Sequence, residues 1–203
     1  MDAIGCAACF VKKRSPSAKG QRRRMSKASV LIPIVVFVAL VALLGFGFRL
    51  SDPRLLPSEN LGEPIPAFQL PNLLTGRLMT EADLTGEPFL LNVWATWCPS
   101  CVAEHDALTA IHTQYGVKII GVNYNDDVDA ARRWLEQLGD PYAFHVVDAE
   151  GTLAVDLGVY GAPETFVVNA EGTILYRHVG VVTEGVYQDT LATYLAQDSM
   201  GGS

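Results

Sequence analysis

Basic side chains are scarce over most of this chain. From Ser51 onward, six Lys or Arg residues stand against twenty-one Asp or Glu residues. Because proteins that bind nucleic acid carry basic patches, this deficit argues against a nucleic-acid partner. Histidine and cysteine are also rare, with four of each in 203 residues. After residue 50 there is a single CxxC pair and no HxxxH spacing, so a structural zinc site with four ligands is not expected and no metal is predicted.

Charge is absent from one long run near the N-terminus. The nineteen residues from Val30 to Phe48 carry none and are rich in Val, Leu, Ile and Phe, which is long enough for a membrane-spanning helix. Eight Lys or Arg residues and one acid, Asp2, precede residue 30, so the N-terminus is predicted to be cytoplasmic and the rest to lie outside. A cleaved signal peptide is the alternative, although its apolar core is usually shorter and only Gly45-Phe46-Gly47 resembles a cleavage site.

These features divide the sequence into five regions. We predict a basic cytoplasmic tail over residues 1–29, a single membrane anchor over 30–49, a proline-rich linker over 50–66, a folded domain over 67–197 and a disordered tail over 198–203. Met25 is an alternative start, which would make residues 1–24 an upstream extension. Cys6 and Cys9 share the CxxC spacing but lack a flanking strand or helix, so no role is assigned to them. The folded part is long enough for one ordinary domain.

Within the domain, apolar runs of strand type alternate with runs of helix type. This order predicts a thioredoxin-like α/β fold, in which a leading β-hairpin precedes a central mixed sheet flanked by helices. Asn125, Asp126 and Asp127 are expected to begin and cap one of the helices. The expected strands are 67–70, 77–79, 89–94, 117–123, 144–147, 165–168 and 174–177, and the expected helices are 81–84, 102–115, 125–138, 151–157 and 186–195.

The motif Cys98-Pro99-Ser100-Cys101 lies where the central strand meets the next helix. The N-terminus of a helix favours thiolate, the reactive form of cysteine, through its dipole and its unpaired N–H groups. Cys98 is therefore the candidate nucleophile and is expected to be exposed, and Cys101, one turn deeper, is the candidate resolving thiol. The strand–CxxC–helix context indicates a redox-active disulfide. A structural disulfide or half of a zinc site are the alternatives.

Two segments carry a resemblance to a known family. The run VWATWCPSC from Val93 to Cys101 and the run GVYGAPETF from Gly158 to Phe166 are similar to segments of the DsbE/CcmG thiol:disulfide oxidoreductases of cytochrome c maturation. The likeness extends from about Leu50 to about Ala196. It implies a thioredoxin-like enzyme, a protein-disulfide reductase anchored in the bacterial inner membrane by a single span, with its C-terminal domain in the periplasm.

The same resemblance implies partners. The reductase is expected to keep the CxxCH cysteines of apocytochrome c reduced for haem attachment, either directly or through a haem lyase or another maturation partner. A DsbD/CcdA-like membrane thiol reductant is expected to renew its dithiol. Because the electrons come from protein dithiols, no cofactor is expected beyond the Cys98–Cys101 dithiol/disulfide couple.

Pro163 and its neighbour form a second element of the implied site. The resemblance implies that Pro163 is a cis-proline facing the CxxC motif, which leaves the backbone of Ala162 free to pair with a substrate strand. A plain proline at a strand edge is the alternative. Trp97, which precedes Cys98, is expected to lie at the surface and to pack against substrate.

Two glutamates are candidate active-site acids. Asn92 stands six residues before Cys98, where ordinary thioredoxins carry a buried acid, and an amide cannot accept that proton. The resemblance points instead to Glu104 and Glu164. A carboxylate near Cys98 is expected to raise the pKa of its thiol and to serve as a proton acceptor. The alternatives are a solvated helix face for Glu104 and a charge at a strand edge for Glu164.

Two other functions fit the same pair of cysteines. A copper-binding chaperone would hold Cu(I) between reduced Cys98 and Cys101, and a general periplasmic thiol:disulfide oxidoreductase would oxidise secreted proteins. The acid-rich surroundings argue against a strong oxidant, because such an oxidant needs a stabilised thiolate. We therefore expect a reducing protein.

Overall fold

The computed structural model describes residues 32, 34–43 and 60–201. Residues 32 and 34–43 are helical. Within these ranges, no helix combines the length and the hydropathy that a bilayer crossing requires. The predicted anchor over 30–49 lies partly outside the described residues and stays a prediction, and the basic tail and most of the linker lie wholly outside them. The chain divides into two units, Met1–Ser51 and Asp52–Ser203, and the second contains the fold described below.

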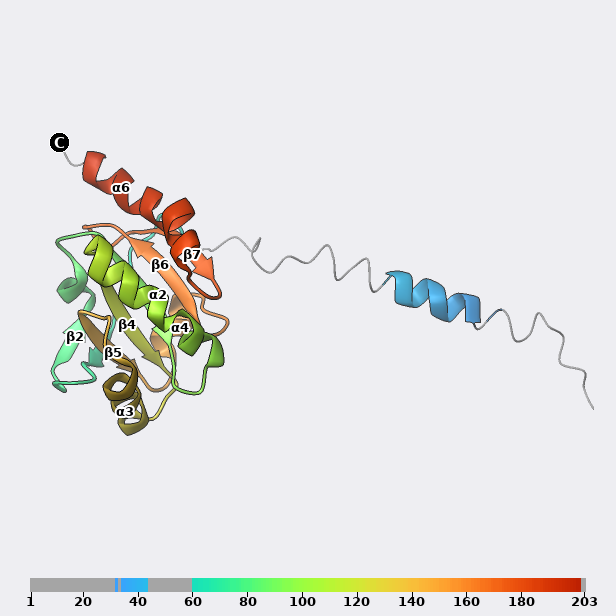
Figure 1. The fold of residues 1–203 in the computed structure, drawn as a ribbon, viewed down its shortest axis with the longest axis horizontal. Coiled ribbons are helices and arrows are strands. Elements are labelled where there is room, and N and C mark those ends of the chain that lie inside the picture. Colours follow the sequence, from blue (N-terminus) through green and yellow to red (C-terminus); the bar gives the residue numbers. More distant parts are fainter. Residues whose placement is uncertain (1–31, 33, 44–59, 202–203) are drawn as a thin grey trace, which may run out of the picture. The chain divides into compact units, whose positions relative to one another are not determined.

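A mixed five-stranded sheet is the centre of this second unit (Figure 1). Strand β3 lies in the middle, parallel to β4 and antiparallel to β6. Strand β5 extends the parallel half, and β7 extends the antiparallel half. The strand order is β5-β4-β3-β6-β7, with bounds Phe144–Asp148, Lys118–Tyr124, Phe89–Trp94, Glu164–Val168 and Ile174–Val179. This architecture confirms the predicted thioredoxin-like fold with a central mixed sheet.

Helices make the parallel crossovers and cover the sheet. Helix α2, Pro99–Tyr115, joins β3 to β4, and helix α3, Val128–Leu138, joins β4 to β5. A short hairpin of β1, Gln69–Pro71, and β2, Leu78–Thr80, precedes them, followed by the 3-10 turn η2, Glu81–Leu84. Helix α4, Thr152–Asp156, follows β5. The C-terminal helix is continuous through α5, Glu184–Val186, the π-helical turn η3, Tyr187–Leu191, and α6, Ala192–Gly201, and it runs past the predicted domain end at residue 197.

Alternation along β3 separates two cores, because successive strand residues point to opposite faces of a sheet. Every residue of β3 is buried, as expected for a central strand that is covered on both faces. The first core cluster packs under α2, α3 and the C-terminal helix and includes Leu90, Trp94, Cys98, Cys101, Leu108, Ile111, Leu135, Tyr142, Val167 and Leu191. The second core cluster lies on the other face and includes Met79, Leu84, Phe89, Leu91, Val93, Ile120, Val122, Leu153, Phe166 and Val168.

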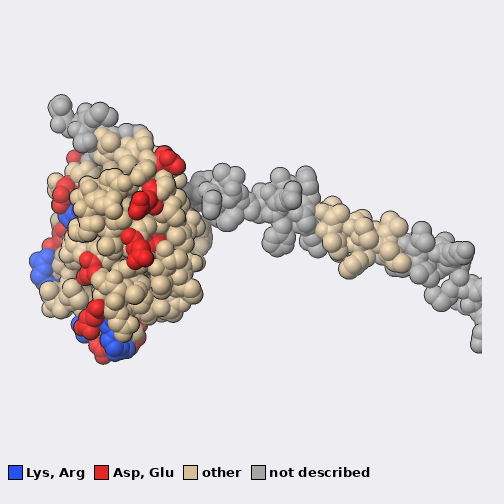
Figure 2. All heavy atoms as spheres, in the orientation of Figure 1, with Lys and Arg blue, Asp and Glu red and all other residues tan. Residues whose placement is uncertain are grey.

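The charge imbalance of the sequence is visible on the folded surface. On the face of the domain shown in Figure 2, acidic side chains are spread widely and the few basic ones lie along the left and lower margins. One of the basic residues at the domain surface, Lys118, pairs with Glu87 at 3.2 Å, at the start of β4. That position is the end of the parallel strands opposite to the CxxC motif, which follows the carboxyl end of β3.

Candidate active site

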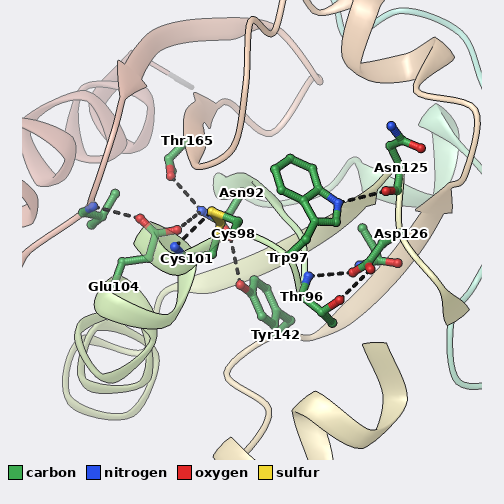
Figure 3. The surroundings of a disulfide bond; sticks show 12 residues. Asn92, Thr96, Trp97, Cys98, Cys101, Glu104, Asn125, Asp126, Tyr142 and Thr165 are labelled. Carbon is green, nitrogen blue, oxygen red and sulfur yellow. Dashed lines mark hydrogen bonds between the residues drawn. A yellow bond between two sulfur atoms is a disulfide. The ribbon is translucent and has the colours of Figure 1, made fainter. Parts of the chain in front are cut away.

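Cys98 and Cys101 form a disulfide at the first turn of α2, with their Cα atoms 5.4 Å apart (Figure 3). Cys98 is the N-cap residue, and its sulfur accepts a hydrogen bond from the backbone N–H of Cys101 at 3.1 Å. Pro99 occupies the first helical position, where its missing N–H costs nothing. The helix ends at Tyr115, and Gly116 closes it in the left-handed conformation. The structure therefore brings the two predicted redox cysteines together at a helix N-terminus.

The expectation that Cys98 is exposed is wrong for this oxidised state. Cys98 and Cys101 are each only 2% exposed, and both belong to the first core cluster. The reason is the capping geometry, because the Cys98 sulfur turns back over the first turn of the helix toward the Cys101 N–H. A molecule that reacts with the Cys98 sulfur must therefore also contact the residues around it.

One such residue is Trp97, which is 52% exposed beside Cys98, as predicted. Its indole N–H donates to the backbone carbonyl of Asn125 at 2.9 Å, and its ring meets Tyr124 edge-on at 6.1 Å between centroids. These contacts hold the ring in place while one side of it stays open. An anchored, exposed aromatic side chain of this kind can pack against a peptide without losing much conformational freedom.

The loop before the cysteines is held by Asp126, for which the sequence favoured a helix-capping role. Its carboxylate accepts from the backbone N–H of Thr96 at 2.7 Å and from the Thr96 hydroxyl at 2.6 Å. The amide of Asn123 donates to the same carboxylate at 2.9 Å. Asp127 is the actual N-cap of α3, through the N–H of Ala130. Asp126 therefore joins the active-site loop to the loop that begins α3 (Figure 3).

The peptide bond between Ala162 and Pro163 is cis, as the resemblance implied for this proline. Pro163 immediately precedes β6, and its carbonyl accepts from Gly180 at 3.0 Å. Ala162 is partly exposed and packs against the cluster that contains both cysteines. Among residues 60–201, no group donates to or accepts from the backbone of Ala162. Its N–H and C=O are therefore available to an incoming strand.

Glu164 lies on the sheet face opposite the one that α2 covers, and its predicted role as an active-site acid stays a prediction. In the β3–β6 register, Glu164 pairs with Val93 and Thr165 pairs with Asn92. Glu164 thus shares the sheet face of the second core cluster, opposite the face that α2 covers. It is not a strand-edge charge either, because it is 1% exposed and accepts from Nε of Arg177 at 2.6 Å.

The Glu164 carboxylate supports the loop before Pro163. Its other oxygen accepts from the backbone N–H of Tyr160 at 2.9 Å. The Arg177 guanidinium lies 5.0 Å from the Tyr160 ring centroid and 5.7 Å from that of Phe166. Tyr160 is itself 74% exposed. The ion pair therefore fixes the backbone that leads to Ala162 while leaving an aromatic ring at the surface.

Glu104 is fully buried, so it does not lie on a solvated helix face. It occupies the same buried stripe of α2 as Cys101, one turn further along the helix. The side-chain N–H of Asn92 donates to its Oε1 at 2.9 Å, and the backbone N–H of Val182 donates to its Oε2 at 2.9 Å. Burial raises the pKa of Glu104 from its ordinary value of 4.5 to about 7, against the lowering effect of these two donors. A carboxyl group with this pKa can accept a proton near neutral pH.

His105 is a second titratable residue in the buried part of α2. It is buried on α2, and its ring packs edge-on against Trp134 at 4.6 Å between centroids. Burial lowers the pKa of His105, which favours the neutral ring. Within residues 32, 34–43 and 60–201, no three His, Cys, Asp or Glu side chains are grouped so that they could hold a metal ion.

Comparison with known proteins gives a consistent set of relatives. The Redoxin family model matches residues 60–195. The thiol:disulfide interchange protein DsbE of Pseudomonas aeruginosa is 48% identical over 174 residues, which cover 85% of this chain and 96% of that protein. The protein of the same name from Escherichia coli K12 is 42% identical over 173 residues, which cover 82% and 93%.

Solved structures agree with these relatives. A Chlorobium tepidum protein with the provisional name thiol:disulfide interchange protein DsbE matches with a TM-score of 0.59 at 26% identity, covering 66% of this chain and 97% of that one. A thio-disulfide isomerase of Thermus thermophilus matches with a TM-score of 0.56 at 25% identity, covering 66% and 96%.

Proposed function

The chain belongs to the DsbE family of thiol:disulfide interchange proteins, and we propose that it is a membrane-anchored periplasmic protein-disulfide reductase of cytochrome c maturation. The family makes it a thiol:disulfide oxidoreductase. The proposal adds the direction of electron flow, the substrate and the location. The observation that carries it is the Cys98–Cys101 disulfide at the first turn of α2, beside the unpaired backbone of Ala162.

In the proposed reaction the reduced protein donates two electrons. The Cys98 thiolate attacks one sulfur of the partner's disulfide, so that a mixed disulfide forms and one partner thiolate leaves. Cys101 then loses its proton and attacks the Cys98 sulfur, which releases the second partner thiolate. The Cys98–Cys101 disulfide forms as the partner's disulfide is reduced, and the two partner thiolates take up protons.

Glu104 is the proposed acceptor of the Cys101 proton. It lies one helical turn beyond Cys101 on the same buried stripe, and its pKa of about 7 suits proton transfer at neutral pH. A buried carboxylate in this position also disfavours thiolates nearby, because like charges repel. A dithiol whose thiolates are not stabilised gives up electrons readily. We therefore expect a reduction potential well below that of DsbA, about −120 mV.

The substrate is proposed to bind as an extended segment across the disulfide. Its backbone pairs with the free N–H and C=O of Ala162, in the loop before β6, through strand-like hydrogen bonds. Trp97 covers the segment from the side of α3, through an aromatic ring that is half exposed and already anchored. These contacts recognise backbone and apolar surface, which suits an unfolded polypeptide.

The CxxCH segment of apocytochrome c, presented directly or by a haem lyase or other maturation partner, is the proposed substrate, because haem addition requires free thiols in a compartment that oxidises them. A DsbD/CcdA-like thiol reductant in the inner membrane is the proposed electron source. The uncharged run from Val30 to Phe48 and its basic flank support an anchor whose N-terminus is cytoplasmic.

Covalent trapping tests the proposal. In cells that make c-type cytochromes, full-length Cys101→Ser should accumulate mixed disulfides with apocytochrome c or a maturation partner, because the resolving thiol is absent. Cys98→Ser should trap none, and the double variant controls for Cys6 and Cys9. Equal trapping by Cys98→Ser contradicts the assigned roles. Trapping of unrelated secreted proteins alone contradicts the proposed substrate.

A further inference from the structure

A set of buried polar side chains behind the cysteines is built around the amide of Asn92. Asn92 projects from β3 toward α2 and is fully buried. Its Nδ2 donates to Oε1 of Glu104 at 2.9 Å and to Oγ1 of Thr165 at 3.0 Å. Its Oδ1 accepts from the hydroxyl of Tyr142 at 2.9 Å (Figure 3). Both N–H groups of the amide are thus occupied, and its oxygen has a partner.

Tyr142 supplies its hydroxyl from a rigid position. The residue lies between α3 and β5 and belongs to the first core cluster. Its ring stacks on Trp94 at 5.9 Å between centroids and meets His145 edge-on at 4.6 Å. Because its ring is packed on two sides, Tyr142 cannot easily move with the Asn92 amide. The hydroxyl is therefore a fixed point against which the Asn92 amide is aligned.

The orientation of that amide decides what Glu104 faces. As observed, an N–H points at Glu104 Oε1. Turned over, the amide would place its oxygen against the carboxylate, and two acceptors repel each other. The turned amide would also leave the Tyr142 proton without an acceptor, since Asn92 Oδ1 is the only hydrogen-bond partner of that hydroxyl among residues 60–201. An unpaired buried donor is costly, so the hydroxyl favours the observed orientation.

We propose that Tyr142 and Asn92 are positioning residues for Glu104: the tyrosine hydroxyl fixes the amide, and the amide holds an N–H on Oε1 of the proton acceptor. The inference rests on the proposed role of Glu104. It also explains how an amide can stand at position 92: the residue no longer carries the proton but supplies the donor that keeps a carboxyl group on α2 ionisable.

Tyr142→Phe tests the positioning in the full-length oxidised protein. The carboxyl carbon of Glu104, assigned by its absence in Glu104→Gln, is followed by NMR against pH. We expect its titration midpoint to rise by about 0.5–1 pH unit, because an unanchored amide is a weaker donor to the carboxylate. Tyr187→Phe is the matched control, since Tyr187 is buried in the same core cluster and its ring contacts Tyr115 instead. In Tyr187→Phe the titration midpoint of Glu104 should equal that of the wild type.

Asn92→Asp is a second variant in case Tyr142→Phe does not fold. It keeps an oxygen toward Tyr142 but replaces the N–H facing Glu104 by another oxygen. Two carboxyl groups then share the site, and the higher of their apparent pKa values should exceed that of the wild-type Glu104 by more than the shift in Tyr142→Phe. The proposal is overturned if Tyr142→Phe titrates like Tyr187→Phe, or if Asn92→Asp leaves the midpoint unchanged.

Disulfide-reduction rates separate this inference from the proposed function. Tyr142→Phe should slow single-turnover reduction of a protein disulfide near neutral pH, and its rate should approach that of the wild type as pH rises, because the Glu104 carboxyl group is then ionised in both proteins. If the titration midpoints shift but the protein reduces no protein disulfide at any pH, the proposed function is refuted and the positioning role is supported. If reduction is normal but the midpoints do not shift, the positioning role is refuted and the proposed function is supported.

Discussion

The buried carboxyl group of Glu104 should make the stability of the oxidised protein depend on pH. Glu104 is 0% exposed, and burial raises its pKa from 4.5 to about 7. Between these two values the folded protein holds a proton that the unfolded chain has released. The free energy of unfolding therefore falls as pH rises, because the native state binds more protons than the unfolded state. The contribution is fully present below about pH 4.5 and lost as pH passes about 7.

The size of this effect follows from the two pKa values. At 1.36 kcal/mol for each unit, the rise from 4.5 to about 7 corresponds to about 3 kcal/mol. Glu104→Gln isolates this quantity, because glutamine resembles the protonated acid in size and carries no charge at any pH. We expect the variant to match the wild type at about pH 4 and to be more stable by about 3 kcal/mol at about pH 8.

Urea unfolding of the oxidised full-length proteins across this pH range measures the difference. Glu136→Gln serves as the control, because Glu136 lies on the exposed side of α3 and its replacement removes one surface charge. The subtraction of wild type from variant cancels the pH dependence of all other groups. If that difference is the same at every pH, Glu104 is not desolvated and the reasoning about its proton fails.

Two further substitutions test the supports of the site. Arg177→Met leaves the Glu164 carboxylate buried without its cation, so urea unfolding should show a free energy of unfolding lower by about 3–5 kcal/mol. Adding Glu164→Gln should recover part of this loss. An unchanged free energy of unfolding would mean that the ion pair is not desolvated. Asp126→Ala removes the hydrogen-bond acceptor of Thr96 and should lower the free energy of unfolding by about 1–3 kcal/mol. It should also slow disulfide exchange in a stopped-flow assay, with Asp126→Asn as the isosteric control. Unchanged stability and rate would show that other contacts hold the loop.

Much of the fold could be predicted from the sequence, because its signals are local. Pro99 at the first helical position and Gly116 at the C-cap mark the ends of α2 within a few residues. The CxxC pair needs only its own spacing and the strand before it. The same local reading failed for Cys98, whose burial depends on how one sulfur turns toward the N–H of Cys101 rather than on its position along the helix.

The site contacts that sequence reasoning missed are distant in the chain. Asp126 reaches Thr96 across 30 residues, and Tyr142 reaches Asn92 across 50. The sheet face of Glu164 could not be predicted for a different reason. All five residues of β6 are buried, so no alternation of polar and apolar residues reveals which face each one occupies. Only the register with β3 shows that Thr165, and not Glu164, faces the side of α2.

The ion pair between Glu164 and Arg177 supports the loop that leads to Ala162. The Glu164 carboxylate accepts a hydrogen bond from the backbone N–H of Tyr160, on the face of the sheet that α2 does not cover. Under the proposed function, substitutions around Phe166 are therefore expected to shift the exposed Tyr160 ring and alter which polypeptides bind, while both sulfur atoms and Glu104 keep their positions. In this architecture, selectivity and reactivity are free to evolve separately.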